Sequence, residues 1–168
     1  GSGWTKQTVV TDHDAGEFNS LAIDSSGHPH ICYFYQNLSG ADAWFGKLEY
    51  VSWNGNAWVR ELVDDAGSGS GGESGEHCQL VMDDTDTPRI IYRSVTESNY
   101  VINEHLRYAV RNSSGGWAIE PVTLDQDNWG ASLALAPDGT PHVAIYDSDS
   151  ASLRYLTRTT GGWTGSII

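Results

Sequence analysis

Hydrophobic and polar positions alternate in short segments along this chain, and the same order of segments recurs three times. The segments SLAID (20–24) and SLALA (132–136) alternate small with large apolar residues, so Leu21 and Ile23 fall on one face of an extended strand. Turn-forming residues follow each segment, and the next apolar run then opens with Pro29, Pro88 or Pro141. The pattern predicts short β-strands joined by tight hairpins and almost no helix.

Each repeat contains four such segments. Outer segments begin at Trp4, Trp58, Trp117 and Trp163, inner segments at Leu21, Leu80 and Leu133, and Leu-x-Tyr motifs at Leu48, Leu106 and Leu153. We therefore expect three four-stranded units at about 18–63, 78–122 and 131–168, in a single segment that covers 4–168. Because outer segments begin at four places and the others at three, residues 4–10 form an extra outer strand in this interpretation. Residues 1–3 are interpreted as a remnant of cloning.

The spacing between segments separates two kinds of connection. The distance from Leu to Pro is 8 residues in all three repeats, whereas Val to Leu takes 12, 17 and 11 residues and Pro to Leu-x-Tyr takes 19, 18 and 12. Alternate turns of an antiparallel meander emerge at the same edge, so all the variable loops share one face. Loops that vary between repeats commonly mark a binding face.

Repeating four-stranded antiparallel units with small residues on the inner strand predict an all-β fold, the β-propeller. The stretch SLAIDSSGHPHICY (20–33), followed by L-x-Y and G-G-W, resembles propeller repeats that are common in bacterial secreted and surface proteins. The resemblance covers nearly the whole chain. It implies a secreted or cell-surface location.

Two narrower resemblances concern one turn. The segment SWNGNAW (52–58) resembles the Asp-box of sialidase-like propellers, but its spacing is short and the Asp is missing, which argues against sialidase activity. The longer YVSWNGNAW (50–58) is similar to turns of fucose-binding propeller lectins, some of which reach six blades by joining short chains. The sugar-clamping arginine of those lectins would fall near Cys32, Ile91 or Ala144, so fucose itself is not expected.

Three blades are too few to close a ring, because propellers typically have four to eight. An isolated arc would expose two apolar ends and a strand edge, both of which drive association. We therefore expect the chain to be its own partner, in a closed six-blade homodimer with strands exchanged at the junctions. A trimer of nine blades and an excised piece of a longer array are the alternatives.

The net charge argues against two classes of partner. Nine basic and 22 acidic residues give a net charge of −13, which would repel nucleic acid and anionic membranes. The apolar runs are too short for insertion into a membrane.

Cys32 and Cys78 are expected to be two buried free thiols, with one disulfide as the alternative. No cofactor is expected, although the loop acids leave loosely bound calcium as an alternative.

The candidate ligand-binding residues lie in the variable loops. They are Trp44, Phe45, Tyr100, Asp127, Trp129, Asp14 and Glu76. Exposed aromatic rings beside carboxylates suit a saccharide, because rings stack on its C–H faces and acids accept its hydroxyl hydrogen bonds. Carbohydrate binding is therefore our leading hypothesis. A structural or protein-binding propeller without a small ligand is the alternative, and a polysaccharide hydrolase or lyase is the second alternative.

No residue is nominated as catalytic or as a metal ligand. The chain lacks the motif of a nucleophilic serine and the spacing of known metal sites. His30 and His142 follow matching prolines, with Arg89 at the equivalent position of the middle repeat. A position that recurs in every repeat indicates a structural role, such as hydrogen bonding between strands or blades.

Overall fold

The computed structural model of the chain describes residues 3–12, 14–36, 46–66, 72–98, 101–122, 130–148 and 150–168. Within these residues twelve strands form three four-stranded antiparallel sheets, which we call blades 1 to 3. Blade 1 contains β1 (Asp14–Ile23), β2 (Pro29–Gln36), β3 (Gly46–Trp53) and β4 (Trp58–Asp64). Blade 2 contains β5 (Glu73–Met82), β6 (Pro88–Ser98), β7 (Val101–Arg111) and β8 (Trp117–Pro121). Blade 3 contains β9 (Ala131–Leu135), β10 (Pro141–Asp147), β11 (Ser152–Thr159) and β12 (Gly162–Ile167).

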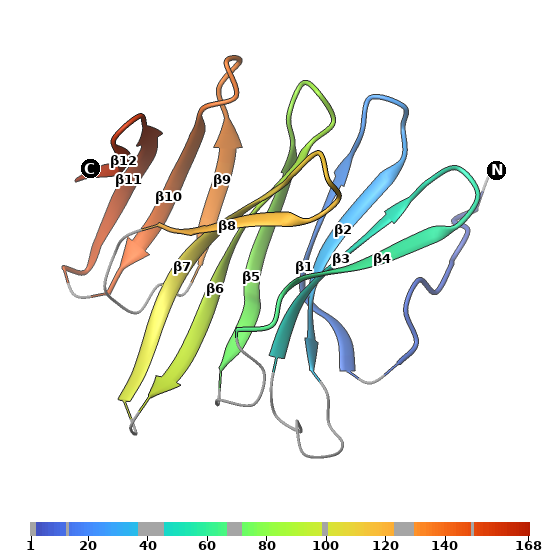
Figure 1. Ribbon diagram of the computed structural model, residues 1–168, viewed down its shortest axis with the longest axis horizontal. Coiled ribbons are helices and arrows are strands. Elements are labelled where there is room, and N and C mark those ends of the chain that lie inside the picture. The colour runs from blue at the N-terminus through green and yellow to red at the C-terminus, as the bar shows by residue number, and fades with distance from the viewer. Residues whose placement is uncertain are drawn as a thin grey trace.

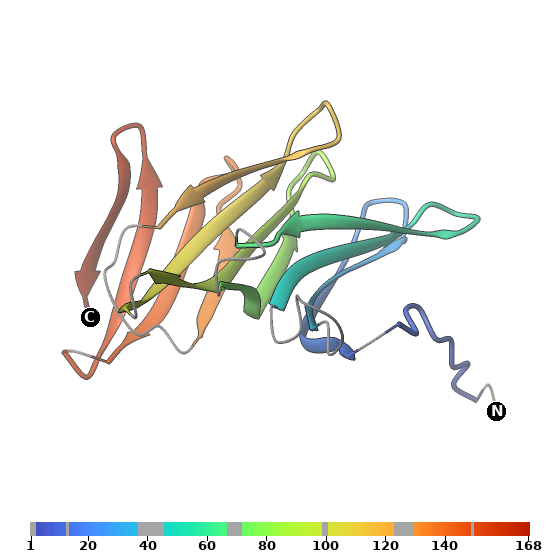
Figure 2. The ribbon, with the colours of Figure 1, turned by 60° about the horizontal axis from the view of Figure 1, so that its bottom comes forward.

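The three blades stand side by side in chain order, as Figure 1 shows from one face and Figure 2 from a view turned by 60°. Each blade runs from an inner strand to an outer strand in sequence order, and the inner strands β1, β5 and β9 contact one another in turn. The two chain ends lie at opposite ends of the row. Blades 1 and 3 therefore each have one flank that no other blade covers.

The tight hairpins that the sequence predicts are present. Pro29, Pro88 and Pro141 are the first residues of β2, β6 and β10. The preceding turns each place one residue at positive φ, namely Gly27 (82°), Asp86 (58°) and Gly139 (81°). These turns, together with those between the third and fourth strands, lie at one edge of the row, which we call the hairpin edge. The strand ends that lead into the connections of variable length lie at the opposite edge, the variable edge.

The inner strands of blades 1 and 2 begin earlier than the sequence indicates. Asp14 and Glu76, which we expected in loops, lie in β1 and β5. Both strands contain a β-bulge where pairing with the neighbouring strand shifts twice. A bulge inserts unpaired residues and breaks the two-residue period, so the polar and apolar pattern does not reveal the strand.

Two apolar cores lie between the blades. The first joins Cys32, Leu48, Tyr50 and Val63 of blade 1 to residues of blade 2 that include Leu80, Ile90 and Tyr92. The second joins Ile91, Leu106, Tyr108 and Val122 of blade 2 to Leu133, Val143, Ile145 and Leu156 of blade 3. Strand side chains alternate between the two faces of a sheet, so blade 2 contributes to both cores.

The two cysteines are joined by a disulfide bond, so the expectation of two free thiols is wrong. Cys32 lies on β2 and Cys78 on β5, with their Cα atoms 6.6 Å apart. The sulfurs are buried between blades 1 and 2 because residues of both blades face the same apolar core. The bond therefore links the first two blades covalently.

The N-terminal segment lies on the uncovered flank of blade 1. Val9 and Val10 pack against a small cluster around Tyr33, Tyr35 and Val51. Arg60 of β4 holds the segment by donating two hydrogen bonds to Asp12, of 2.7 and 2.9 Å. Residues 3–11 form no strand, so the extra strand at 4–10 is not present within one chain. Its pairing with a second copy stays a prediction, and the fourth strand of blade 3 is supplied by β12.

Candidate functional site

A hollow of about 450 Å³ opens among the inner strands. Its lining comes from all three blades and includes Phe18, Asn19, His77, Gln79, Ser132, Tyr146 and Leu153. Ser132 is near the start of β9, Tyr146 near the end of β10 and Leu153 near the start of β11, so blade 3 contributes from its variable edge. The hollow thus lies next to the edge where the sequence predicts a binding face.

The two bulges bring Phe18 and His77 together. Gly16 and Gly75 have φ values of 110° and 109°, which a residue with a side chain rarely adopts. Two residues further on, Phe18 and His77 also have positive φ, of 48° and 52°. Their rings are 4.5 Å apart at an interplanar angle of 49°. The equivalent bulges of adjacent blades therefore place two rings side by side in the hollow.

The hollow combines exposed rings with neutral polar groups. Phe18 is 39% and Tyr146 51% exposed, which is high for rings of this size in a folded chain. Asn19 and Gln79 supply amide groups and Ser132 a hydroxyl. Amides and hydroxyls both donate and accept hydrogen bonds, so the lining can pair with a ligand that carries several hydroxyl groups.

Glu76, a predicted ligand residue, takes part in a charged cluster on β5, β6 and β7. Arg93 donates to Glu76 and, over 2.9 Å, to Glu104. All three side chains are largely buried, and one guanidinium is shared by two carboxylates. Burial raises the pKa of nearby Glu73, an effect that the charge of Arg93 opposes. The cluster fixes the strands of blade 2 near the hollow.

The other predicted ligand residues do not line this hollow. Asp14 is the exposed first residue of β1 and faces Gln36 in the strand register. Trp44, Phe45, Tyr100, Asp127 and Trp129 lie outside the described residues. Sequence reasoning missed Phe18 and Tyr146 because each stands in a strand rather than in a loop. The glycines before Phe18 and His77 are the one signal of the bulges in the sequence.

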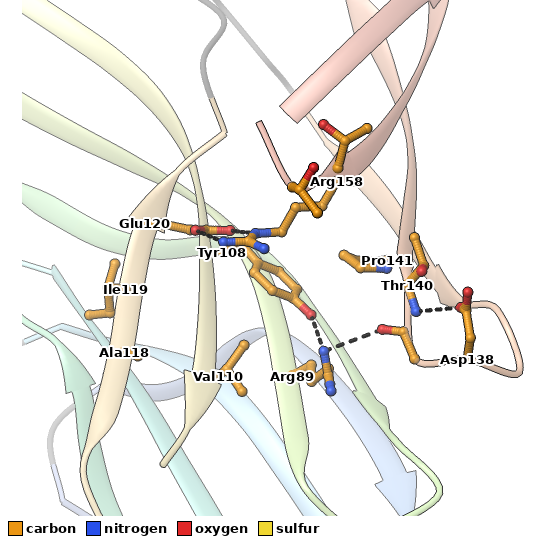
Figure 3. Close-up of a pocket in the computed structure, with 13 residues that line it drawn as sticks. Arg89, Tyr108, Val110, Ala118, Ile119, Glu120, Asp138, Thr140, Pro141 and Arg158 are labelled. Atoms are coloured by element: carbon orange, nitrogen blue, oxygen red, sulfur yellow. Dashed lines mark hydrogen bonds and ion pairs between the residues drawn. The ribbon is translucent and has the colours of Figure 1, made fainter. Parts of the chain in front are cut away.

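A second hollow, of about 740 Å³, lies between blades 2 and 3 at the hairpin edge (Figure 3). Arg89 donates 3.3 Å hydrogen bonds to the Tyr108 hydroxyl and to the carbonyl of Gly139. Arg158 donates two hydrogen bonds, of 2.6 and 2.9 Å, to Glu120, and they hold the pKa of that carboxyl below its usual value. Both arginines therefore form hydrogen bonds between blades 2 and 3.

The recurring position after the proline has the structural role that the sequence indicates. The imidazole of His30 forms a hydrogen bond with the Tyr50 hydroxyl, and that of His142 with the Tyr155 hydroxyl. Arg89 contacts the equivalent tyrosine of blade 2. In each blade this residue ties the second strand to the third through the tyrosine of the Leu-x-Tyr motif.

Two further features bear on the kind of site. Across the described ranges, His, Cys, Asp and Glu side chains form no group of three that could hold a metal ion. In the same part of the chain, no helix is long and apolar enough to cross a membrane. Most of the described carboxylates that form ion pairs do so with an arginine, as Glu120 does with Arg158.

Comparison with known proteins gives a likeness of fold. No protein-family model matches the chain, and no curated protein matches it. Among solved structures it is similar to the Hadza microbial sialidase Hz136, with a TM-score of 0.59 and 12% sequence identity. The likeness covers 89% of this chain and 32% of that structure, so the chain spans about a third of the sialidase's length. At this identity the likeness concerns the fold, a set of propeller-like blades, and carries no activity with it.

Proposed function

We propose that this chain is a β-propeller segment that binds carbohydrate in the hollow among its inner strands. The observation that carries the proposal is the joint presence of two exposed rings, Phe18 and Tyr146, with amide and hydroxyl groups in one hollow. Aromatic rings stack on the apolar faces of sugar rings, and the polar groups between them pair with hydroxyls. A hollow of about 450 Å³ falls in the usual range for small ligands.

The location beside the variable edge agrees with this role. Strands hold Phe18 and Tyr146 in place, and the strand ends that lead into the connections of variable length lie beside the hollow. Neutral amide and hydroxyl groups line the hollow beside the rings, so neutral sugars are the preferred class. The net charge of −13 disfavours strongly anionic polysaccharides.

Calorimetric titration with a panel of neutral mono- and oligosaccharides tests the proposal. Phe18→Ala and Tyr146→Ala should each weaken binding about two- to tenfold, because a stacked ring contributes about 0.5–1.5 kcal/mol. Leu62→Ala is the matched control, since Leu62 is 51% exposed on the outer strand β4 and lies far from the hollow in the strand order. Absence of binding at millimolar sugar, or equal affinity of all variants, would refute carbohydrate binding.

The uncovered flanks support self-assembly as the second part of the proposal. Leu80 and Leu133 are 5% and 8% exposed between blades, but the equivalent Leu21 of blade 1 is 58% exposed. At the other end, Leu48 and Leu106 are 0% and 2% exposed, but the equivalent Leu153 of blade 3 is 52% exposed. Apolar side chains that are buried in every internal contact indicate surfaces that a further blade would cover.

We infer that two copies close a six-blade ring, with three copies as the alternative. Light scattering coupled to size exclusion at micromolar concentration tests this, because a ring of two has twice the single-chain mass of 18.3 kDa. A stable single chain would overturn it. A ring that assembles but binds no sugar would instead favour a structural or protein-binding propeller. The disulfide supports a secreted or cell-surface location, since such bonds persist in oxidising compartments.

A further inference from the structure

The same four side chains meet at both contacts between blades, and we call this set the seam quartet. The preceding blade presents a Tyr and a Glu that face each other across its third and fourth strands, and the following blade presents an Arg and a Trp paired in the same way. The first quartet consists of Tyr50, Glu61, Arg111 and Trp117, and the second of Tyr108, Glu120, Arg158 and Trp163. The strand register thus defines equivalent positions in all three blades.

Both quartets make the same two contacts. Arg111 binds Glu61 through hydrogen bonds of 3.0 and 2.9 Å, as Arg158 binds Glu120. The Tyr50 and Trp117 rings meet edge to face at 5.2 Å, and the equivalent rings of the second quartet at 5.3 Å. In the second quartet the Trp163 indole also donates to Glu120 over 3.0 Å.

The two uncovered flanks carry the two halves of a third quartet, and both charged members are replaced. On blade 3, Tyr155 faces Ser166 where the other blades have Glu. On blade 1, Trp58 faces Trp53 where the other blades have Arg. The tryptophan rings pair with each other at 5.6 Å. The Trp58 indole nitrogen is buried without a hydrogen-bond partner among the described residues, as is that of Trp117 in the first quartet.

We propose that blade 3 of one copy packs on blade 1 of a second copy through a neutral quartet of Tyr155, Ser166, Trp53 and Trp58. This rests on the proposed self-assembly and names its surface and direction. The internal ion pairs are partly buried, with Glu61 18% and Arg111 38% exposed, so a Glu at 166 alone or an Arg at 53 alone would leave a partly desolvated charge without its partner. Replacement of both keeps the contact neutral. A small and a large side chain also fill the space that two long ones fill elsewhere.

The neutral quartet also gives the contact its specificity. Ser166 holds the register position of Glu120, which accepts the indole hydrogen bond of Trp163, and its shorter hydroxyl is the acceptor that this contact offers to the partner's Trp58. Blade 1 cannot replace an internal blade without placing Trp53 against a glutamate that has lost its arginine. The contact joins two different surfaces, so copies join head to tail, and a ring forms when the rotation from blade to blade adds up to a full turn.

A charge-restoration cycle in the full chain tests the proposal. Ser166→Glu and Trp53→Arg should each weaken assembly about tenfold or more, measured as the dissociation constant by sedimentation velocity. The double variant recreates the ion pair of the internal contacts and should recover most of the lost affinity. Ser113→Glu, at the exposed tip of the hairpin between β7 and β8, adds the same charge away from both flanks and should leave assembly unchanged. Circular dichroism of each variant confirms the fold.

The outcomes separate this proposal from the proposed function. If the unaltered chain stays single at high micromolar concentration, self-assembly fails and the quartet falls with it. If the chain assembles but Ser166→Glu behaves like Ser113→Glu, or the two changes add without recovery, only the head-to-tail quartet is refuted. That second result would hold if residues 4–10 of a partner displaced β12, because Gln7 would then occupy the place of Ser166.

Discussion

Breaking the disulfide between Cys32 and Cys78 should cost a large part of the stability of the chain. The bond closes a loop across a sequence separation of 46 residues. In the chain-entropy description, a loop of this length restricts the unfolded state by about 4 kcal/mol at 25 °C. Total stabilities of domains are about 5–15 kcal/mol, so the loss would lower the melting temperature by roughly 10 °C.

The assay compares the oxidised protein with the same protein under a reductant, by urea and thermal unfolding. Alkylation and mass spectrometry confirm the state of both sulfurs. Cys78→Ser should match the reduced protein, because either change opens the same loop. Equal midpoints for the oxidised and reduced forms, with full reduction verified, would refute the argument that this bond restrains the unfolded chain.

Two further predictions concern the hairpin edge and a bulge. Burial alone would raise the pKa of Asp83, but hydrogen bonds from Thr85, Thr87 and Arg89 outweigh it and lower the pKa to about 2. A lowered folded pKa stabilises the chain above the unfolded value of 3.8, so Asp83→Asn should cost about 2 kcal/mol at pH 7. Most of this cost should disappear as the pH falls from about 4 to 2. If the urea midpoints of the unaltered chain and the variant differ as much at pH 2 as at pH 7, the prediction is wrong. Gly75→Ala should destabilise by about 2 kcal/mol or more, because its Cβ would lie 2.8 Å from the Leu48 backbone at a φ of 109°. Gly27→Ala, at positive φ but in open space, is its control and should cost clearly less in the same assay.

Period and spacing in the sequence identify most of the fold. The constant distance of eight residues from Leu21 to Pro29, and at the two equivalent places, predicts the hairpins of all three blades, which the structure confirms. Tight turns and alternating strands depend on local geometry that neighbouring residues determine. The approximate position of the second and third strands is therefore readable from the chain.

The disulfide, the bulges and the hollow depend on contacts between residues that are distant in sequence. No local pattern shows that Cys32 and Cys78 face the same core, since their strands belong to different blades. The bulges remove the alternation that would have placed Phe18 in a strand. Tyr146 appears as part of an ordinary strand, and no local pattern shows that its ring is exposed beside the bulges of the other blades. The seam quartet can be recognised only from the strand register, which shows which residues of the three blades are equivalent.

If copies join as proposed, the N-terminal segment on blade 1 competes with the second copy for the same flank. Val9 and Val10 cover apolar surface beside Ile31 and Tyr33, on the flank that a second copy would need. A tethered segment acts at a high effective concentration, so at low protein concentration it would hold the flank against a second copy. Assembly would then require a protein concentration at which the larger face of a whole blade displaces the segment. The segment would thus keep newly made chains apart until enough of them have accumulated to complete a ring.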